Sequence, residues 1–238
     1  MRFALVTGTS SGIGLAVARG LLERGWQVLG VSRRQPASLL AVGAGYSHLA
    51  LDLADASSWT SVAARVGPWM AKDPDRIGLV NNAADGSGGR AQNLDPAELA
   101  RHFALNAAAP LWLMGLIART RPQGAAVRVV NVSSGAATRA IAGLSAYCAS
   151  KAALRMAGMT LAEEVEGDFS IVSYGPGVVD TAMQAAARSR SKDDFPSVDL
   201  FKGFHAEGRL APPEAPAQEI IALLEAEFSD KFNERRRA

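Results

Sequence analysis

A tyrosine and a lysine four positions apart, Tyr147 and Lys151, stand in a stretch made mostly of alanine, serine and glycine, "SAYCASKAALRMAG". On an α-helix, side chains at positions i and i+4 lie on the same face, so the phenol and the ammonium can point into one site. At about 4 Å and an effective dielectric of about 20, the ammonium would attract a phenolate by roughly 4 kcal/mol and lower the phenol pKa by about two or three units. The two side chains are therefore a candidate acid/base pair, although the spacing also fits a tyrosine at a buried edge beside a solvated lysine.

A glycine-rich turn, "TGTSSGIG", supplies a second chemical signal, with glycines at positions 8, 12 and 14. Glycine gives such a turn its conformational freedom and lets the backbone approach a pyrophosphate, while the unpaired N–H groups of the following helix face the anion. The turn lies between an apolar strand-like run and a helical segment, as a dinucleotide fingerprint requires. Its spacing, G-x-x-x-G-x-G, departs from G-x-G-x-x-G and indicates a variant of the nucleotide-binding turn.

The end of the second apolar run favours one nicotinamide cofactor over the other. An NAD-binding chain places an acidic residue about 20 residues after the glycines to hold the ribose 2′-hydroxyl, but this chain has Ser32, Arg33 and Arg34 there. Guanidinium groups bind a 2′-phosphate in a bidentate manner, whereas a carboxylate would repel it. We therefore predict NADP(H), with two solvated loop arginines as the alternative. Asp52, after the third run, is the next carboxylate within reach of the adenine.

The elements that must position these residues follow a β-α-β-α order, in which short apolar runs alternate with longer helical segments. The predicted strands span residues 3–7, 26–32, 47–51, 77–83, 127–134 and 169–174. This order predicts one α/β domain over residues 1–238, with a doubly wound, mostly parallel sheet of Rossmann type and helices on both faces. Ligands of such folds bind at the carboxyl ends of the strands.

The chain after residue 180 is less regular. Residues 181–211 mix charges, prolines and three phenylalanines, Phe195, Phe201 and Phe204, ahead of a predicted helix over 213–227. This segment is either a lobe that covers the substrate or a surface excursion that the phenylalanines fasten to the core. The last residues, "FSDKFNERRRA", are polar and poor in strand formers, which argues against a final edge strand without excluding one.

A further candidate lies in a long helix over residues 94–120. Asp95 is a probable cap by residue type, with Pro96 at the first helical position and Glu98 near the capping-box position. Pro110 follows Asn106 by four residues and has no N–H to bond its carbonyl, so the helix should kink and leave that carbonyl free. A water held there would pass protons to Lys151, unless the kink serves packing alone.

Composition excludes several classes of protein. The 238 residues carry a formal net charge of +2, with one basic run at 235–237, so no nucleic-acid partner is predicted. No signal segment opens the chain, no apolar run approaches the roughly 20 residues that span a bilayer, and Cys148 is the single cysteine. The three histidines, at positions 48, 102 and 205, lack metal-ligand spacing, and no metal is predicted. We expect a cytoplasmic protein without membrane contact.

Together these features resemble the short-chain dehydrogenase/reductase family from residue 3 to about residue 183. The matching blocks are "TGTSSGIG", "LDLAD" (51–55), "NNAA" (81–84), Asn106, "VVNVSS" (129–134), "YCASK" (147–151) and "YGPGVVDT" (174–181). The resemblance implies a catalytic tetrad of Asn106, Ser134, Tyr147 and Lys151. Ser134 is chosen over Ser133 because it stands 13 positions before Tyr147, the usual spacing in the family.

The resemblance also implies a reaction and a cofactor site. Tyr147 would protonate the oxygen of a carbonyl reduced by hydride, Ser134 would donate to that oxygen, and Lys151 would bond the nicotinamide ribose. The residues expected at the cofactor are Gly8, Ser10, Ser11, Gly12, Ile13, Gly14, Ser32, Arg33, Arg34, Asp52, Leu53, Asn82, Ala83, Ala84, Tyr147, Lys151, Pro176, Gly177, Val179 and Thr181.

A looser resemblance points to the subgroup that contains sepiapterin reductases and benzil reductases. It implies an aromatic, pterin-like or dicarbonyl substrate, with Phe195 and Phe201 as candidate walls, and a homodimer or homotetramer. A 3-oxoacyl-type reductase and a dinucleotide-sensing regulator without turnover are the alternatives.

Overall fold

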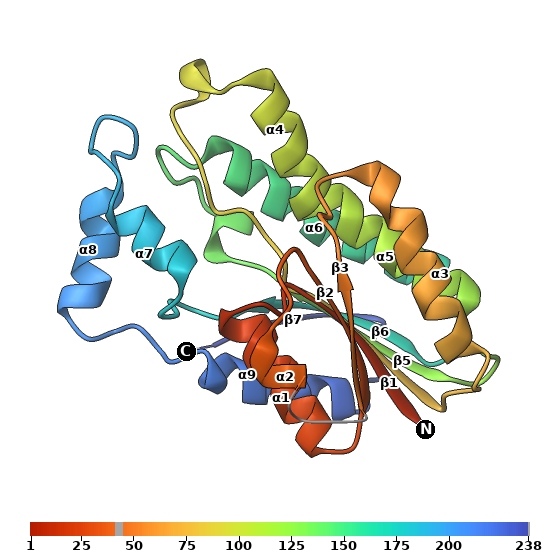
Figure 1. The fold of residues 1–238 in the computed structure, drawn as a ribbon. Coiled ribbons are helices and arrows are strands. Elements are labelled where there is room, and N and C mark those ends of the chain that lie inside the picture. The colour runs from red at the N-terminus through yellow and green to blue at the C-terminus, as the bar shows by residue number, and fades with distance from the viewer. Residues whose placement is uncertain (41–44, 238) are drawn as a thin grey trace.

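The parallel sheet predicted from the sequence is present in the computed structural model, which describes residues 1–40 and 45–237. Seven strands of these residues form one sheet in the order β3-β2-β1-β4-β5-β6-β7, and each neighbouring pair is parallel (Figure 1). The strands are β1 (Arg2–Thr7), β2 (Gln27–Ser32), β3 (Tyr46–Ala50), β4 (Arg76–Asn81), β5 (Ala126–Val132), β6 (Phe169–Gly175) and β7 (Phe232–Arg236). The strand order reverses between β1 and β4, which is where open parallel sheets bind ligands.

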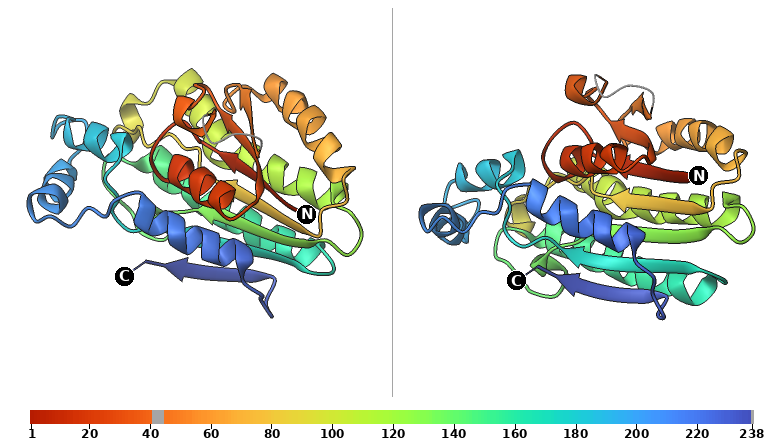
Figure 2. Two further views of the ribbon diagram at one scale, coloured as in Figure 1. Left: turned by 60° about the horizontal axis from the view of Figure 1, so that its bottom comes forward. Right: turned by 90° about the horizontal axis from the view of Figure 1, so that it is seen from below.

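Helices cover both faces of the sheet (Figures 1 and 2). One core packs β-strand side chains against α3, α5 and α6, and a second core packs the other face against α1 and α9. The helices are α1 (Gly12–Glu23), α2 (Ala37–Leu40), α3 (Trp59–Met70), α4 (Pro96–Phe103), α5 (Ala109–Thr120), α6 (Ser145–Glu164), α7 (Ala182–Arg188), α8 (Val198–Ala206) and α9 (Glu214–Glu225). The doubly wound α/β fold is therefore confirmed, and the six predicted strands agree to within two residues at each end.

The final strand corrects the sequence-based expectation. Residues 232–236 pair with β6 as β7, although they are polar and poor in strand formers. The connection into β7 is held by Arg128 of β5, whose side chain is 1% exposed and donates to the Ala226 carbonyl at 2.8 Å. Its guanidinium also pairs with Asp168 and Glu227, at 2.6 Å each. A tertiary anchor, rather than strand propensity, thus places β7 at the edge.

We predict that Arg128→Ala lowers the free energy of unfolding by about 3 kcal/mol, because it removes a buried guanidinium that bonds the Ala226 carbonyl and pairs with two partly exposed carboxylates. Arg209→Ala is the control, since Arg209 and its partner Glu207 are both largely exposed and such a pair contributes about 0 to 1 kcal/mol. Urea unfolding followed by circular dichroism measures both. Equal losses in the two variants would show that Arg128 does not anchor β7.

The long helix is interrupted at the predicted place. Asp95 caps α4 by accepting from the N–H groups of Ala97 and Glu98, at 2.9 Å each. A π-helical turn over Ala104–Ala108 contains Asn106 and precedes Pro110, so the interruption is a π-turn between α4 and α5. By length and hydropathy this helical run, Pro96–Thr120, would be able to cross a membrane. Its α5 side chains pack in the core of the sheet, as core helices of the same composition do.

Residues 181–211 lie beyond one end of the sheet and carry α7 and α8 (Figures 1 and 2). Phe195 is fully buried between α7 and α8, and packs with Leu144 and Val198. Its ring lies 5.0 Å from that of Phe201, centroid to centroid. The first phenylalanine therefore fastens this segment to the loop before α6 and does not line an open cavity.

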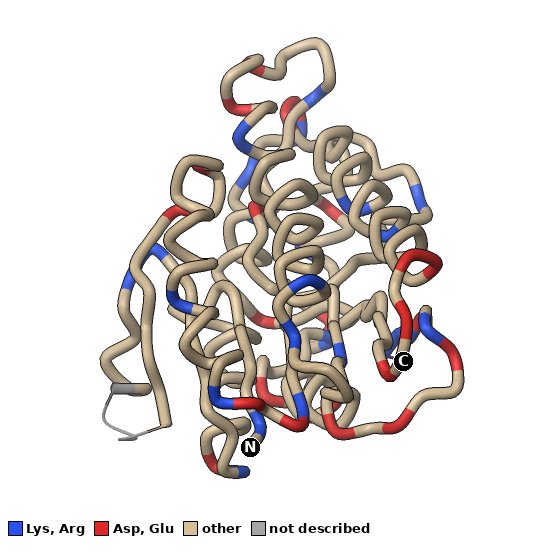
Figure 3. Tube along the Cα trace, turned by 90° about the vertical axis from the view of Figure 1, so that its right-hand side faces the viewer, with Lys and Arg blue, Asp and Glu red and all other residues tan. Residues whose placement is uncertain are grey.

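Charged residues of both signs are interspersed over the face drawn in Figure 3, in keeping with the small net charge. A groove or stripe of one sign would be the electrostatic footprint of a nucleic-acid-binding protein. That face has no such stripe within the described residues.

Candidate active site

The glycine-rich turn joins β1 to α1 and is packed too closely for side chains. Gly8 has a positive φ of 75°, and a Cβ atom there would lie 2.7 Å from Asn82 Nδ2. A Cβ on Gly14 would lie 2.4 Å from the Gly8 carbonyl oxygen. Asn82 fixes this turn by donating to the carbonyl of Thr7 at 3.0 Å. The backbone of the turn is thus held at the carboxyl end of β1, open to close approach by a ligand.

The N-terminus of α1 is suited to bind an anion. Ser11 is the N-cap but makes no side-chain capping hydrogen bond, and the first turn has no acidic residue. The N–H groups of the first turn, which include Gly12 and Ile13, have no partner within the helix, and the helix dipole adds positive potential there. Ser10 is half-buried in the same turn. These groups fit the pyrophosphate of a dinucleotide.

The end of β2 carries the residues predicted to select the cofactor. The Ser32 hydroxyl donates to the Arg34 carbonyl at 2.9 Å and lies 3.0 Å from His48 Nε2. It also lies 3.3 Å from Thr9 Oγ1 in the glycine-rich turn. The Arg33 and Arg34 side chains are exposed. Two guanidinium groups are therefore available beside the phosphate-binding turn.

The two residues after β3, Asp52 and Leu53, have partners within the protein. Asp52 forms an ion pair with Arg101 of α4 at 2.7 Å and accepts from the Ala54 N–H at 3.0 Å. Burial alone would raise the pKa of Asp52, but these bonds outweigh it and hold that pKa below its usual value. The Leu53 side chain is buried in the core, and its carbonyl accepts from Trp59 Nε1 at 2.9 Å. Only the backbone N–H of Leu53 is left to face a cofactor.

The loops after β4 and β6 complete one edge of the sheet. Asn81 donates to Asn131 of β5 at 2.8 Å, so this asparagine pair ties neighbouring strands together. After β6, Val179 forms a bridge with Ala211, and Thr181 caps α7. A Cβ on Gly12 would contact Thr181 at 3.3 Å, so the loop after β6 lies beside the glycine-rich turn after β1. The loops after β4 and β6 hold further predicted residues. The remaining predicted residues, Ala83, Ala84, Pro176 and Gly177, lie in these same two loops.

Tyr147 and Ser134 meet across the end of β5. Tyr147 lies in the first turn of α6, and its phenol is close enough to the Ser134 hydroxyl for that group to lower the phenol pKa. Ser134 caps the short 3₁₀-helix Gly135–Ala137 and accepts from the Ala136 N–H at 3.2 Å. The chain thus brings together the phenol and the hydroxyl expected to share a substrate oxygen.

Lys151 lies one helical turn after Tyr147 with its Nζ 5.7 Å from the centre of the phenol ring. The ammonium is 3% exposed and donates to the Val132 carbonyl at 2.8 Å. Burial lowers the pKa of Lys151 to about 8. Burial also raises the pKa of Tyr147 to about 12, although the Ser134 hydroxyl opposes this. The phenol pKa is thus raised in this structure and not lowered as expected, because removal from water disfavours the phenolate.

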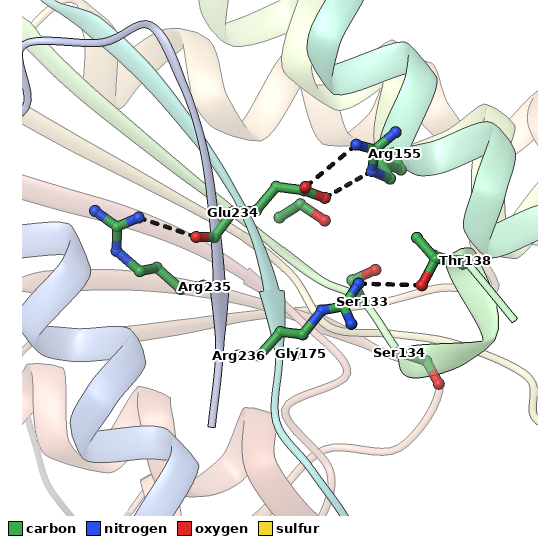
Figure 4. A pocket seen from close by; sticks show the side chains of 10 residues that line it. Ser133, Ser134, Thr138, Arg155, Gly175, Glu234, Arg235 and Arg236 are labelled. Carbon is green, nitrogen blue, oxygen red and sulfur yellow. Dashed lines mark hydrogen bonds and ion pairs between the residues drawn. The ribbon is translucent and has the colours of Figure 1, made fainter. Parts of the chain in front are cut away.

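The pocket beside β5 explains the choice between the two serines (Figure 4). Ser133 and Ser134 are successive residues, and their side chains point in different directions, as alternation along an extended chain requires. Around Ser133, Arg155 pairs with Glu234 at 2.6 Å, and Arg236 donates to Thr138 at 3.0 Å. Both serines line this polar pocket next to β7, and Ser134 is the one whose hydroxyl also influences the pKa of Tyr147.

The Asn106 side chain is held in a polar network that sequence reasoning missed. Its amide accepts from the Asp85 N–H and donates to the Asp85 carbonyl, at 2.8 Å each. His102, 4% exposed, and Ser150, fully buried, lie against the same amide. The spacing of His102 four positions before Asn106 was the available signal, because such residues share a helix face.

Comparisons with known proteins agree with this geometry. The family model described as "short chain dehydrogenase" matches residues 2–192. Benzil reductase ((S)-benzoin forming) of Bacillus cereus is 35% identical over an alignment of 242 positions that covers 95% of this chain and 95% of the relative. Sepiapterin reductase of Xenopus tropicalis is 30% identical, over 94% of this chain and 91% of the relative. A solved 3-oxoacyl (acyl-carrier-protein) reductase of Agrobacterium tumefaciens, with NADP bound, is 25% identical with a TM-score of 0.79, and covers 99% of this chain and 92% of its own.

Proposed function

Because this chain belongs to the short-chain dehydrogenase family of oxidoreductases, whose members bind a nicotinamide dinucleotide, we propose that it is an NADP(H)-dependent carbonyl reductase. The observation that carries the proposal is the meeting of Tyr147, Ser134 and Lys151 at the end of β5, beside an anion-binding turn. A protein that only sensed the dinucleotide would have no need for a proton donor there.

The preference for NADP(H) rests on the end of β2. Arg33 and Arg34 are exposed, and Ser32 replaces the carboxylate that an NAD enzyme places there. Guanidinium groups suit a 2′-phosphate because they bond it with two parallel N–H groups. NADP bound in the similar Agrobacterium tumefaciens reductase supports the same preference.

Three of the chain's own residues take part in the reaction. When bound, the reduced nicotinamide supplies a hydride to the carbonyl carbon of the substrate. Ser134 Oγ holds the substrate oxygen and stabilises the charge that develops on it. Tyr147, whose pKa of about 12 keeps it protonated at neutral pH, donates its proton to that oxygen. Lys151, held by the Val132 carbonyl, orients the nicotinamide ribose and returns a proton to Tyr147.

We assign the substrate to the aromatic or dicarbonyl compounds. Benzil reductases and sepiapterin reductases carry such substrates in their names and align over most of this chain. Two hydrogen bonds join residues 181–211 to the loop after β4. Arg190 donates to the Gly88 carbonyl at 2.6 Å, and Arg90 donates to the Asp193 carbonyl at 2.7 Å. Held in this way, residues 181–211 would cover the substrate. The 3-oxoacyl-type reductase remains the second candidate, on the similarity to the Agrobacterium tumefaciens protein. A cytoplasmic homodimer or homotetramer without nucleic-acid or membrane partners stays a prediction.

A carbonyl panel tests the proposal. The purified protein is titrated with NADPH and NADH by fluorescence and is then assayed for NADPH loss with benzil, sepiapterin and a 3-oxoacyl thioester. We expect tighter binding of NADPH and turnover of benzil or sepiapterin. Turnover of the thioester alone would favour the second candidate, and binding without any turnover would favour a regulator.

The pH dependence of reduction is a further prediction. With Lys151 at a pKa of about 8 and Tyr147 at about 12, both are protonated below pH 8. We expect kcat/KM for reduction to be level below pH 8 and to fall about tenfold per pH unit above it, as Lys151 loses its proton. Steady-state rates from pH 5.5 to 10 measure this. Lys151→Arg, charged throughout this range, should lack the fall near pH 8 even if it is slower. A wild-type profile level to pH 10 would contradict the assignment.

A further inference from the structure

A buried histidine outside the predicted tetrad lies at the centre of a polar network. His102 of α4 is 4% exposed, and its Nε2 lies 2.9 Å from Asn106 Nδ2 and 3.2 Å from Ser150 Oγ. On the other side of the ring, Nδ1 lies 3.5 Å from Asp85 Oδ2. The network joins the loop after β4, the π-helical turn and the catalytic helix α6. Neither the tetrad nor the cofactor site uses this imidazole.

The donors and acceptors of the network fix the state of the ring. Asn106 Oδ1 accepts from the Asp85 N–H, so its Nδ2 is the donor arm that faces His102. His102 Nε2 must therefore be the unprotonated acceptor, and Nδ1 carries the proton that faces the Asp85 carboxylate. Ser150 uses its own proton on the Tyr147 carbonyl at 2.9 Å. Each polar group of the set thus has a complementary partner.

The same three residue types form the triad of serine hydrolases, but the geometry rules out that chemistry here. Ser150 is fully buried, and its hydroxyl proton is committed to a helix carbonyl. The acceptor nitrogen of His102 is occupied by Asn106. A nucleophile needs a free base beside it and access to substrate, and this serine has neither.

We propose that His102 is a positioning residue for carbonyl reduction: with Asp85 it locks the Asn106 amide and thereby sets the π-helical turn against the helix that carries Tyr147 and Lys151. The inference rests on the proposed function. Asn106 is held on two sides, by the Asp85 backbone and by the imidazole, and the ring of His102 also lies edge-on to Tyr147 at 6.3 Å between centroids. Loss of the imidazole would free one arm of the amide and let the turn shift relative to α6.

Three variants of the full-length protein test the proposal. His102→Leu fills the space without polar atoms, and His102→Gln keeps an acceptor for Asn106. We expect kcat to fall about tenfold to a hundredfold in His102→Leu, since displacements of about 1 Å cost rates of this order, while the dissociation constant for NADPH changes less than about twofold. His102→Gln should recover most of kcat. Leu113→Ala, in the buried apolar face of α5 two turns after Asn106, is the control for general destabilisation.

The outcomes separate the possible roles. For Leu113→Ala we expect a lower melting temperature and a wild-type kcat at 25 °C. The same result for His102→Leu would overturn the proposal. Equal loss of kcat in His102→Leu and His102→Gln would also overturn the proposal. It would show that a side-chain acceptor at position 102 for the Asn106 amide does not matter. If His102→Leu fails to fold, the kcat of His102→Gln decides, with the proposal requiring a loss smaller than tenfold. Wild-type protein that turns over no carbonyl would instead refute the proposed function.

Discussion

Replacing Tyr147 with phenylalanine is expected to lower kcat about a thousandfold, within the range of about 10² to 10⁴ that a positioned proton donor contributes. The ring is retained, so packing against Leu144 and the neighbouring residues of the small cluster is kept. Only the hydroxyl beside Ser134 is removed. The dissociation constant for NADPH should change less than about fivefold, because we expect the turn at α1 and the end of β2 to provide most of the cofactor contacts. Single-turnover and steady-state NADPH oxidation measure kcat, and fluorescence titration measures binding.

Cys148→Ala is the matched control for this prediction. Cys148 is the next residue of α6 and is half-buried, and its thiol faces the Arg139 carbonyl at 3.6 Å. The substitution should leave kcat within about twofold of the wild type, as surface and near-surface changes away from a site usually do. Wild-type turnover by Tyr147→Phe would show that the phenol is not the proton donor, and the proposed mechanism would then be wrong.

The second large effect is expected at the end of β2. The double substitution Arg33→Ala/Arg34→Ala should weaken NADPH binding about a hundredfold, since a hydrogen bond to a charged group contributes about 1.5 to 3 kcal/mol and each 1.4 kcal/mol is about tenfold in affinity. Binding of NADH, which lacks the 2′-phosphate, should change less than about threefold. Isothermal titration at fixed ionic strength gives both constants, and their ratio reports selectivity independently of any loss of stability.

A charge-matched control distinguishes direct contact with the 2′-phosphate from an effect of the protein's net charge. Arg65→Ala/Arg119→Ala removes two guanidinium groups from the exposed sides of α3 and α5, and should shift NADPH affinity only slightly, because exposed charges beyond about 10 Å are screened by salt. If both double variants weakened NADPH equally, the effect would be one of overall charge. If Arg33→Ala/Arg34→Ala weakened NADH as much as NADPH, the 2′-phosphate assignment would be wrong.

The burial of Tyr147 sets which ionic form of its phenol is present at neutral pH. Removal from water raises the phenol pKa to about 12, so the protonated form predominates. This is the form that the proposed reduction needs as a proton donor. The tyrosine and lysine types alone predict a lowered phenol pKa instead.

Several features were readable from local sequence because local sequence causes them. Glycine at position 8 is required by its positive φ, and Asp95 with Pro96 specifies a helix start whatever surrounds it. The alternation of short apolar runs with amphipathic segments predicts a parallel sheet, since such strands need helices on both faces. The four-residue spacing of Tyr147 and Lys151 likewise follows from helix geometry.

Other features depend on residues that the chain brings together from far apart. The polar tail at 232–236 becomes a strand because Arg128, about 100 residues earlier, fixes the connection that leads into it. Asp52 forms its ion pair with Arg101 of α4, which lies 49 positions later in the sequence. The role of His102 emerges only when Asp85 and Ser150 arrive beside it. Hydrogen bonds and burial between distant segments have no periodic signature in the sequence, so the tertiary structure alone determined how deeply Tyr147 and Lys151 are buried and which groups surround Asn106.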